Sequence, residues 1–170
     1  AAMFAIAQIS NGSTLEQKGQ LAAKLNSVLK DEPDMHVIIT AHLTLMTLEK
    51  KVSANHLNPI IKQARSKDPS IRLVAIQSLA MTGKDGKAAV PMLLETISDP
   101  EVTFAVAAIN SLVSMEVDEV IPHLKKIMAD KAANPVLRDA AEDGLEIIEF
   151  REKMRKEMKD KEKKDKKDKK

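Results

Sequence analysis

Apolar residues recur along the chain at helical spacing, and one stripe returns at a fixed interval. In each copy the apolar positions fall at i, i+4 and i+8, on one face of an α-helix. The copies are Ile71/Ala75/Leu79, Phe104/Ala108/Leu112 and Leu137/Ala141/Leu145, at a constant step in the numbering, with a fourth copy at Val37/Ala41/Leu45 upstream, where the step is longer by one. Alanine stands at the centre of every stripe, so we expect neighbouring helices to approach closely there.

A second apolar stretch precedes each stripe, and a short turn with proline joins the two. The turns are Asp31–Asp34, Asp68–Ser70, Asp99–Glu101 and Asn134–Pro135. Asp or Asn in such a turn can cap the coming helix, while proline stops the outgoing one. The pattern predicts eight helices in four antiparallel pairs, at 14–30 and 34–50, 55–66 and 69–82, 87–98 and 101–114, and 118–130 and 135–158.

Local signals predict where several of these helices start. Pro59, Pro91 and Pro122 are expected in first turns, where the missing N–H of proline costs nothing. At the front of the chain, Ser13 and Glu16 have the spacing of a capping box.

Composition favours an all-α fold. Aromatic residues make up 2% of the chain, and there are five glycines and no cysteine. The core must then rest on Leu, Ile, Val, Ala and Met, residues that favour helices more than hairpins. A repeat kept through three copies predicts an α-α superhelix, a solenoid of about four helix pairs, in preference to the alternatives of a compact four-helix bundle or an irregular helical domain.

The net charge of +2 hides two parts of opposite sign. Residues 151–170 hold ten Lys and two Arg against six Asp and Glu, a net of +6, which leaves −4 for residues 1–150. We therefore divide the chain into an N-terminal segment (1–12), a repeat domain (13–150, with repeats 13–50, 55–82, 87–114 and 118–150) and a Lys/Asp/Glu-rich extension (151–170) that is either helical or disordered.

The compartment stays open on sequence grounds. The apolar run Ala1–Ile9 is far shorter than the ~20 residues that cross a bilayer, so no transmembrane segment is expected. The absence of cysteine is compatible with a cytoplasmic protein and with one exported after removal of a signal peptide.

Two stretches resemble HEAT repeats. They are Pro59-Ile60-Ile61 with Asp68-Pro69-Ser70-Ile71-Arg72 and Ala75…Leu79, and Pro122-His123-Leu124 with Leu137-Arg138-Asp139-Ala140-Ala141…Leu145. The copy between them departs from the motif because it has Ala105 where the family has Arg. The resemblance covers residues 13–150 and is strongest from residue 55 onward.

The resemblance implies a right-handed superhelix with the second helix of each pair on the concave side. It also implies a structural role for Arg72 and Arg138, which would support the turn acids Asp68 and Asp99 in a ladder between repeats.

No residue pattern argues for catalysis, a metal or a cofactor. His36 and His42 are six residues apart, which does not place two ligands on one helix face, and no histidine is followed by Glu as in deoxyhypusine-hydroxylase-like HEAT enzymes. An acidic body without Trp or Tyr argues against a HEAT-like DNA glycosylase. No motif specifically supports a phycobilin-lyase-like HEAT protein.

The register of the repeats supplies the candidate binding residues. Gln77, Asn110 and Asp143 share one position on successive second helices, and Asp139 lies one turn before Asp143. Beside them runs a column of small residues, Thr44, Ser78, Ser111 and Gly144, which should let helices pack closely. Glu142, Glu146 and Glu149 form an acidic stripe, either a solvated face or a docking patch for a basic partner.

These features predict a monomeric, non-enzymatic module that binds a protein partner through its concave face, with modest affinity because aromatic anchors are lacking. The alternative is an electrostatic tether in which the extension contacts nucleic acid, anionic lipid or an acidic partner.

Overall fold

The computed structural model describes residues 14–167, all of whose regular structure is helical. The predicted segment 1–12, Ser13 and the last three residues of the extension lie outside this range. The α-helices are α2 (Leu15–Asp31), α3 (Met35–Glu49), α4 (Ala54–Gln63), α5 (Pro69–Leu79), α6 (Val90–Thr96), α7 (Val102–Ser114), α8 (Ile121–Ala129) and α9 (Pro135–Lys167). Residues Ala80–Ala89 and Asp118–Val120 form 3₁₀ segments.

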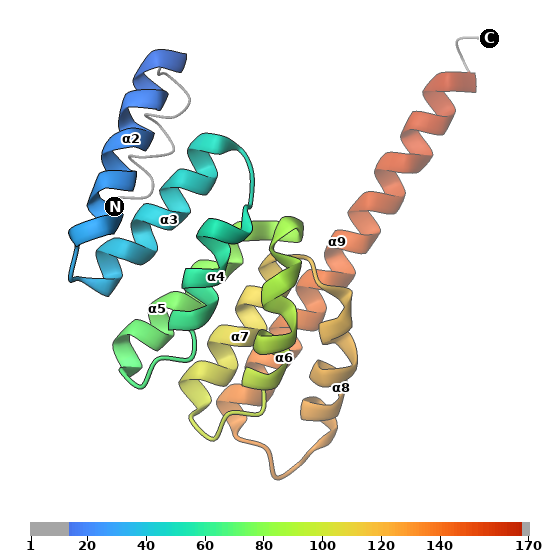
Figure 1. Ribbon diagram of the computed structural model, residues 1–170. Helices are drawn as coiled ribbons and strands as arrows, with labels where there is room; N and C mark the ends of the chain where they lie inside the picture. Colours follow the sequence, from blue (N-terminus) through green and yellow to red (C-terminus); the bar gives the residue numbers. More distant parts are fainter. Residues whose placement is uncertain (1–13, 168–170) are drawn as a thin grey trace.

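The helices form the four antiparallel pairs expected from the sequence, stacked side by side (Figure 1). Each second helix (α3, α5, α7, α9) packs directly against the next one, whereas successive first helices in the described range make no comparable contact. Since the layer of second helices is the more closely packed, it forms the inner side of the stack. We call this side the concave face.

The small residues at the repeat interfaces are buried, as the spacing predicted. The central alanines Ala41, Ala75, Ala108 and Ala141 are all at most 3% exposed. In the small column, the Ser111 hydroxyl donates a 2.9 Å hydrogen bond to the Ile76 carbonyl of α5. A Cβ on Gly144 would lie 3.2 Å from a methyl of Val113 in α7. Larger side chains at these positions would separate the second helices.

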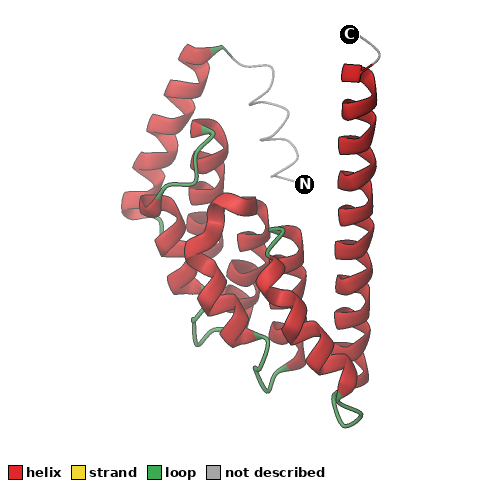
Figure 2. Cartoon of the chain, turned by 90° about the vertical axis from the view of Figure 1, so that its right-hand side faces the viewer, coloured by secondary structure: helices red, strands yellow, loops and turns green. Residues whose placement is uncertain are grey.

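Each of the first three second helices is followed by a residue with positive φ, a regularity that the sequence did not reveal. These residues are Lys50 (φ 52°), Gly83 (φ 53°) and Glu116 (φ 59°), and they follow one another at the same step as the apolar stripes. Only one of them is glycine, although a left-handed backbone is costly for other residues. The fourth equivalent position is Glu149, which lies inside α9. The chain therefore does not turn at the end of the last repeat, and α9 continues past the body (Figure 2).

Three local predictions were wrong. Pro59 lies in the interior of α4, which begins at Ala54, and its missing N–H frees the carbonyl of the exposed Asn55. The capping box is formed by Thr14 and Gln17, one residue beyond the expected Ser13 and Glu16. The helix predicted to end at residue 82 ends as an α-helix at Leu79, and the chain continues as the 3₁₀ segment Ala80–Ala89, in which Gly83 and Gly86 have non-helical backbone angles.

No helix in the described part of the chain is both long enough and apolar enough to span a bilayer.

Candidate protein-binding face

A shallow groove on the concave face brings two of the predicted residues together. Gln77 of α5 and Asn110 of α7 line a groove of about 230 Å³, whose apolar wall includes Leu73, Val106 and Val136. Both amide side chains are exposed. A partner that enters this groove meets hydrogen-bond donors and acceptors above an apolar floor.

The two aspartates of the predicted site lie outside this groove. Asp139 and Asp143 are exposed on α9, which contributes only Val136 to the groove. The polar ladder therefore divides into an amide pair at the groove and a carboxylate pair on the neighbouring helix.

The arginine of the second repeat is held between repeats. Arg72 forms an ion pair with Asp99, the turn acid of the next repeat, and its guanidinium carbon lies 4.2 Å from the centroid of the Phe104 ring. The side chains of Arg72 and Asp99 are 24% and 13% exposed. Asp99 also accepts a hydrogen bond from the Glu101 N–H, 2.9 Å away. These contacts join α5 of the second repeat to the turn before α7 in the third.

The other two residues assigned to this ladder differ from Arg72 and Asp99. Asp68 caps α5, because its carboxylate accepts hydrogen bonds from the N–H groups of Ser70 (2.9 Å) and Ile71 (3.2 Å). Arg138 makes no ion pair with any described residue, although its buried Nε, like that of Arg72, has no hydrogen-bond partner among those residues.

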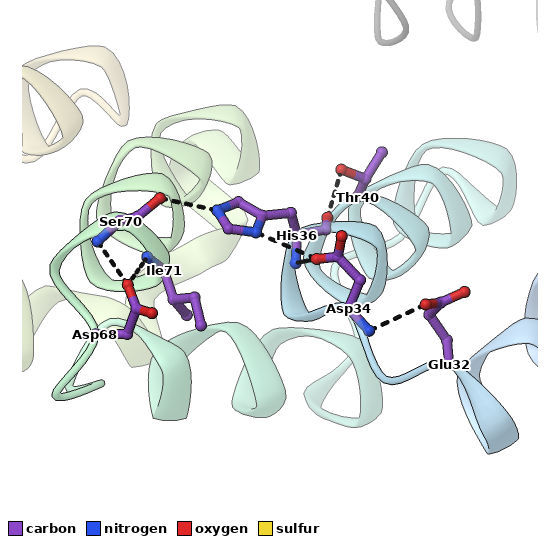
Figure 3. A network of polar contacts seen from close by, with 7 residues as sticks. All are labelled: Glu32, Asp34, His36, Thr40, Asp68, Ser70 and Ile71. Atoms are coloured by element: carbon purple, nitrogen blue, oxygen red, sulfur yellow. Dashed lines mark hydrogen bonds and ion pairs between the residues drawn. The ribbon is translucent and has the colours of Figure 1, made fainter.

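His36 makes a polar contact between α3 of the first repeat and α5 of the second (Figure 3). Its Nε2 lies 3.1 Å from the Ser70 hydroxyl, and its Nδ1 lies 3.2 Å from the Asp34 carboxylate. A hydrogen bond from the His36 N–H to that carboxylate lowers the pKa of Asp34 below its ordinary value. The first repeat has Ile38 at the position of the family arginine, and His36, two residues earlier, makes a polar contact with the second repeat.

A buried histidine pair joins α3 to α4, and no pattern in the sequence indicated it. Nδ1 of His42 lies 3.1 Å from Nδ1 of His56, and both residues are 9% exposed. His56 also reaches Glu49, at 3.3 Å. Burial, and then the neighbouring His56, lower the pKa of His42. The two residues are 14 apart in sequence and meet across a turn, so helical spacing could not pair them.

A cluster around Glu116 anchors the C-terminal extension. The Glu116 carboxylate contacts Lys84 at 2.8 Å and pairs with Arg155, while Nε of Arg151 lies 3.9 Å away. Arg151 also donates to the Val113 carbonyl at 2.8 Å. The hydrogen bond from Lys84, aided by the charges of the two arginines, lowers the pKa of Glu116. The base of the extension is thereby fixed to the turn between α7 and α8.

None of these clusters forms a metal site. Within residues 14–167, no group of three or more His, Asp and Glu side chains has an arrangement that could hold an ion.

Stacked antiparallel helix pairs, small residues between the second helices and an arginine bridging successive turns define an α-solenoid. A family model of HEAT repeats matches residues 57–146, and the chain belongs to the HEAT-repeat family. No curated protein and no solved structure gave a match. HEAT repeats generally mediate protein–protein interactions and are typically non-enzymatic.

Proposed function

We propose that this protein is a non-enzymatic interaction module, a small scaffold or adaptor that binds a protein partner on its concave face. The observation that carries the proposal is the groove shared by Gln77 and Asn110 on adjacent second helices. Solenoids use the extended inner surface for binding, because successive repeats there present equivalent positions side by side.

The chemistry of the groove suits a peptide segment with exposed backbone. Each amide can donate and accept a hydrogen bond. An aliphatic side chain of the peptide can pack against the apolar wall of the groove. Asp139 and Asp143 would add contacts to a basic residue that lies beyond the groove along α9. The groove is small, so affinity would depend on several such weak contacts.

The test compares two double variants in pull-downs from native extract. Gln77→Ala/Asn110→Ala removes both amides from the groove, whereas Asn55→Ala/Asn58→Ala removes two exposed amides from α4 on the outer layer. We expect the groove variant to lose the partner that wild type and the outer variant retain. Equal recovery by both variants would exclude the concave face as the binding surface.

The second candidate is an electrostatic tether. Its support is α9, which carries the basic residues of the extension beyond the anchor at Glu116 as a helix that reaches Lys167. Deletion of residues 159–170 should then abolish binding to RNA, DNA or anionic vesicles and leave the fold intact. Binding that is salt-insensitive, or unchanged by the deletion, would exclude this role.

A further inference from the structure

The middle of α9 carries an apolar strip that is exposed to solvent. Ile147, Phe150, Met154 and Met158 are spaced three, four and four residues apart, which places them on one face of the helix. Their side chains are 40–67% exposed, and Phe150 is the most exposed of the four. The C-terminal half of α9 projects beyond the stack, with no other described helix beside it (Figure 1 and Figure 2). We call these four residues the α9 strip.

The α9 strip lies on a different face from the residues that hold α9 to the body. Ile148 is buried, and it is turned by about 100° around the helix from its neighbour in the strip. Arg151 and Arg155 contact Glu116. A partner can therefore cover the strip and leave the internal contacts of α9 intact.

The charges of α9 are divided between two segments of opposite sign. Residues 139–149 carry five acidic side chains and no basic one, whereas residues 151–161 carry six basic and three acidic ones. Two such helices are complementary when they run antiparallel, because the acidic segment of each then lies beside the basic segment of the other. A parallel pair would place segments of like charge together. The charge pattern thus favours a second copy of this chain, in antiparallel orientation, as the occupant of the strip.

We propose that two copies of the protein pair through their α9 strips, with Ile147 of each copy against Phe150 of the other. Such an interface is isologous, so every contact in it occurs twice. Glu146 and Lys153 are exposed residues that flank the strip on the same edge, and in this register Glu146 of each copy lies beside Lys153 of the other. Burial of the strip drives the pairing, and the charges set its direction.

The oligomeric state of the full chain tests the proposal, since a dimer would replace the monomer expected from the sequence. Four apolar side chains from each copy form a small interface, so sedimentation equilibrium should show a dimer that dissociates on dilution. Phe150→Lys should weaken the dimer about tenfold or more, whereas Met128→Lys, at an exposed apolar position of α8, should leave it unchanged. A wild-type protein that is monomeric at every concentration, or an equal effect of the two variants, would overturn the proposal.

A charge exchange tests the antiparallel register. Glu146→Lys and Lys153→Glu should each weaken the dimer about tenfold or more, because each places like charges side by side at two symmetric positions. An equimolar mixture of the two variants should dimerise again, since every such contact in the mixed pair joins opposite charges. The double variant Glu146→Lys/Lys153→Glu should likewise regain the dimer. A mixture that stays monomeric would exclude this register. The proposal does not depend on the function proposed for the concave face, which is tested by partner recovery.

Discussion

Arg72 of α5 is paired with Asp99, 27 residues later in the turn before α7, and neither side chain is more than a quarter exposed. The pair joins the turns of two successive repeats. A charge pair in this position sets the geometry of the stack, because each partner would be left partly buried and uncompensated without the other.

Removing the charge of Asp99 should lower the free energy of unfolding, whereas removing the charge of Asp68, a turn acid without an ion pair, should not. Asp99→Asn keeps the hydrogen bond to the Glu101 N–H and loses the charge that Arg72 needs, so we expect a loss of about 1–2 kcal/mol in urea unfolding. Asp68→Asn is the matched control. Asn caps a helix as well as Asp does, so its effect should stay within about 0.5 kcal/mol. Equal costs for both variants would mean that the ion pair contributes nothing.

The left-handed residues at the ends of the second helices should respond in opposite directions. Lys50→Gly relieves a positive φ and should stabilise the protein by about 0.5–1 kcal/mol, after the entropy of glycine in the unfolded chain is subtracted. Gly83→Ala forces a side chain into φ 53° and ψ −149° and should destabilise it by about 1–3 kcal/mol. Thermal unfolding of the two variants measures both signs. A gain for Gly83→Ala would contradict the turn geometry.

The close contact at Gly144 should make this position intolerant of larger residues. A Cβ there would already lie 3.1 Å from a methyl of Leu124, so Gly144→Val should cost about 1–3 kcal/mol through overpacking. Gly19 of α2 has no heavy atom within 4 Å of a Cβ, and Gly19→Val should be neutral or slightly stabilising. Urea unfolding of both variants tests the difference, which should vanish if α9 can move away from α8 and α7 at no cost.

Acid should weaken the junction of α3 and α4. His42 has a lowered pKa in the folded protein, whereas in the unfolded chain it takes up a proton as the pH falls through about 6.5. The contribution of His42 to the free energy of unfolding is therefore complete above that pH. Below it, this contribution declines by at most about 1.4 kcal/mol per pH unit. His42→Gln, which leaves His56 with Glu49, should flatten the curve of unfolding free energy between about pH 6.5 and 5.

His123→Gln serves as the control for this pH effect, since His123 lies on α8, away from the pair. It should keep the full acid-dependent decline. A His42→Gln curve as steep as that of wild type would show that other groups cause the loss.

Removal of the Glu116 charge should loosen the base of the extension. In Glu116→Gln the carboxylate that holds Lys84, Arg151 and Arg155 is gone, so amide hydrogen exchange of residues 152–160 should become faster. Glu119→Gln, at an exposed site in the same turn region, should leave it unchanged. Because the pKa of Glu116 is lowered, the wild-type anchor should hold below the ordinary pKa of glutamate and fail only on further acidification. Identical exchange in both variants would argue against the anchor.

The repeat stack could be predicted from the sequence because each signal recurs. The constant step between copies, the Asp-Pro turns and the central alanines support one another, so an error in one copy is corrected by the others. The capping box was misplaced because it is a single local signal. Pro59 recurs as Pro91 and Pro122, but α4 begins five residues before its proline, whereas α6 and α8 each begin one residue before theirs. The neighbouring positions of Gln77 and Asn110 followed from the repeat register, but the groove between them did not. Asp143 has the same register on α9, which contributes only Val136 to the groove.

Contacts between residues at non-equivalent positions of the repeats do not recur along the chain, so the sequence could not predict them. His42 meets His56 across a turn, and Glu116 gathers cations from a 3₁₀ segment and from α9. The left-handed turns recur once in each of the first three repeats, yet two of the three residues are Lys and Glu, whose identity does not disclose the backbone angle. Tertiary structure, and not residue type, selects these conformations.

The unbroken course of α9 has a mechanical consequence. A helix of 33 residues is about 50 Å long, and its first half is wedged against α7 and α8. A force applied near Lys167 would exert a torque on α9 about its contacts with Glu116, in the turn between α7 and α8. Such a force would therefore twist the last repeat, in which α9 packs against α7 and α8.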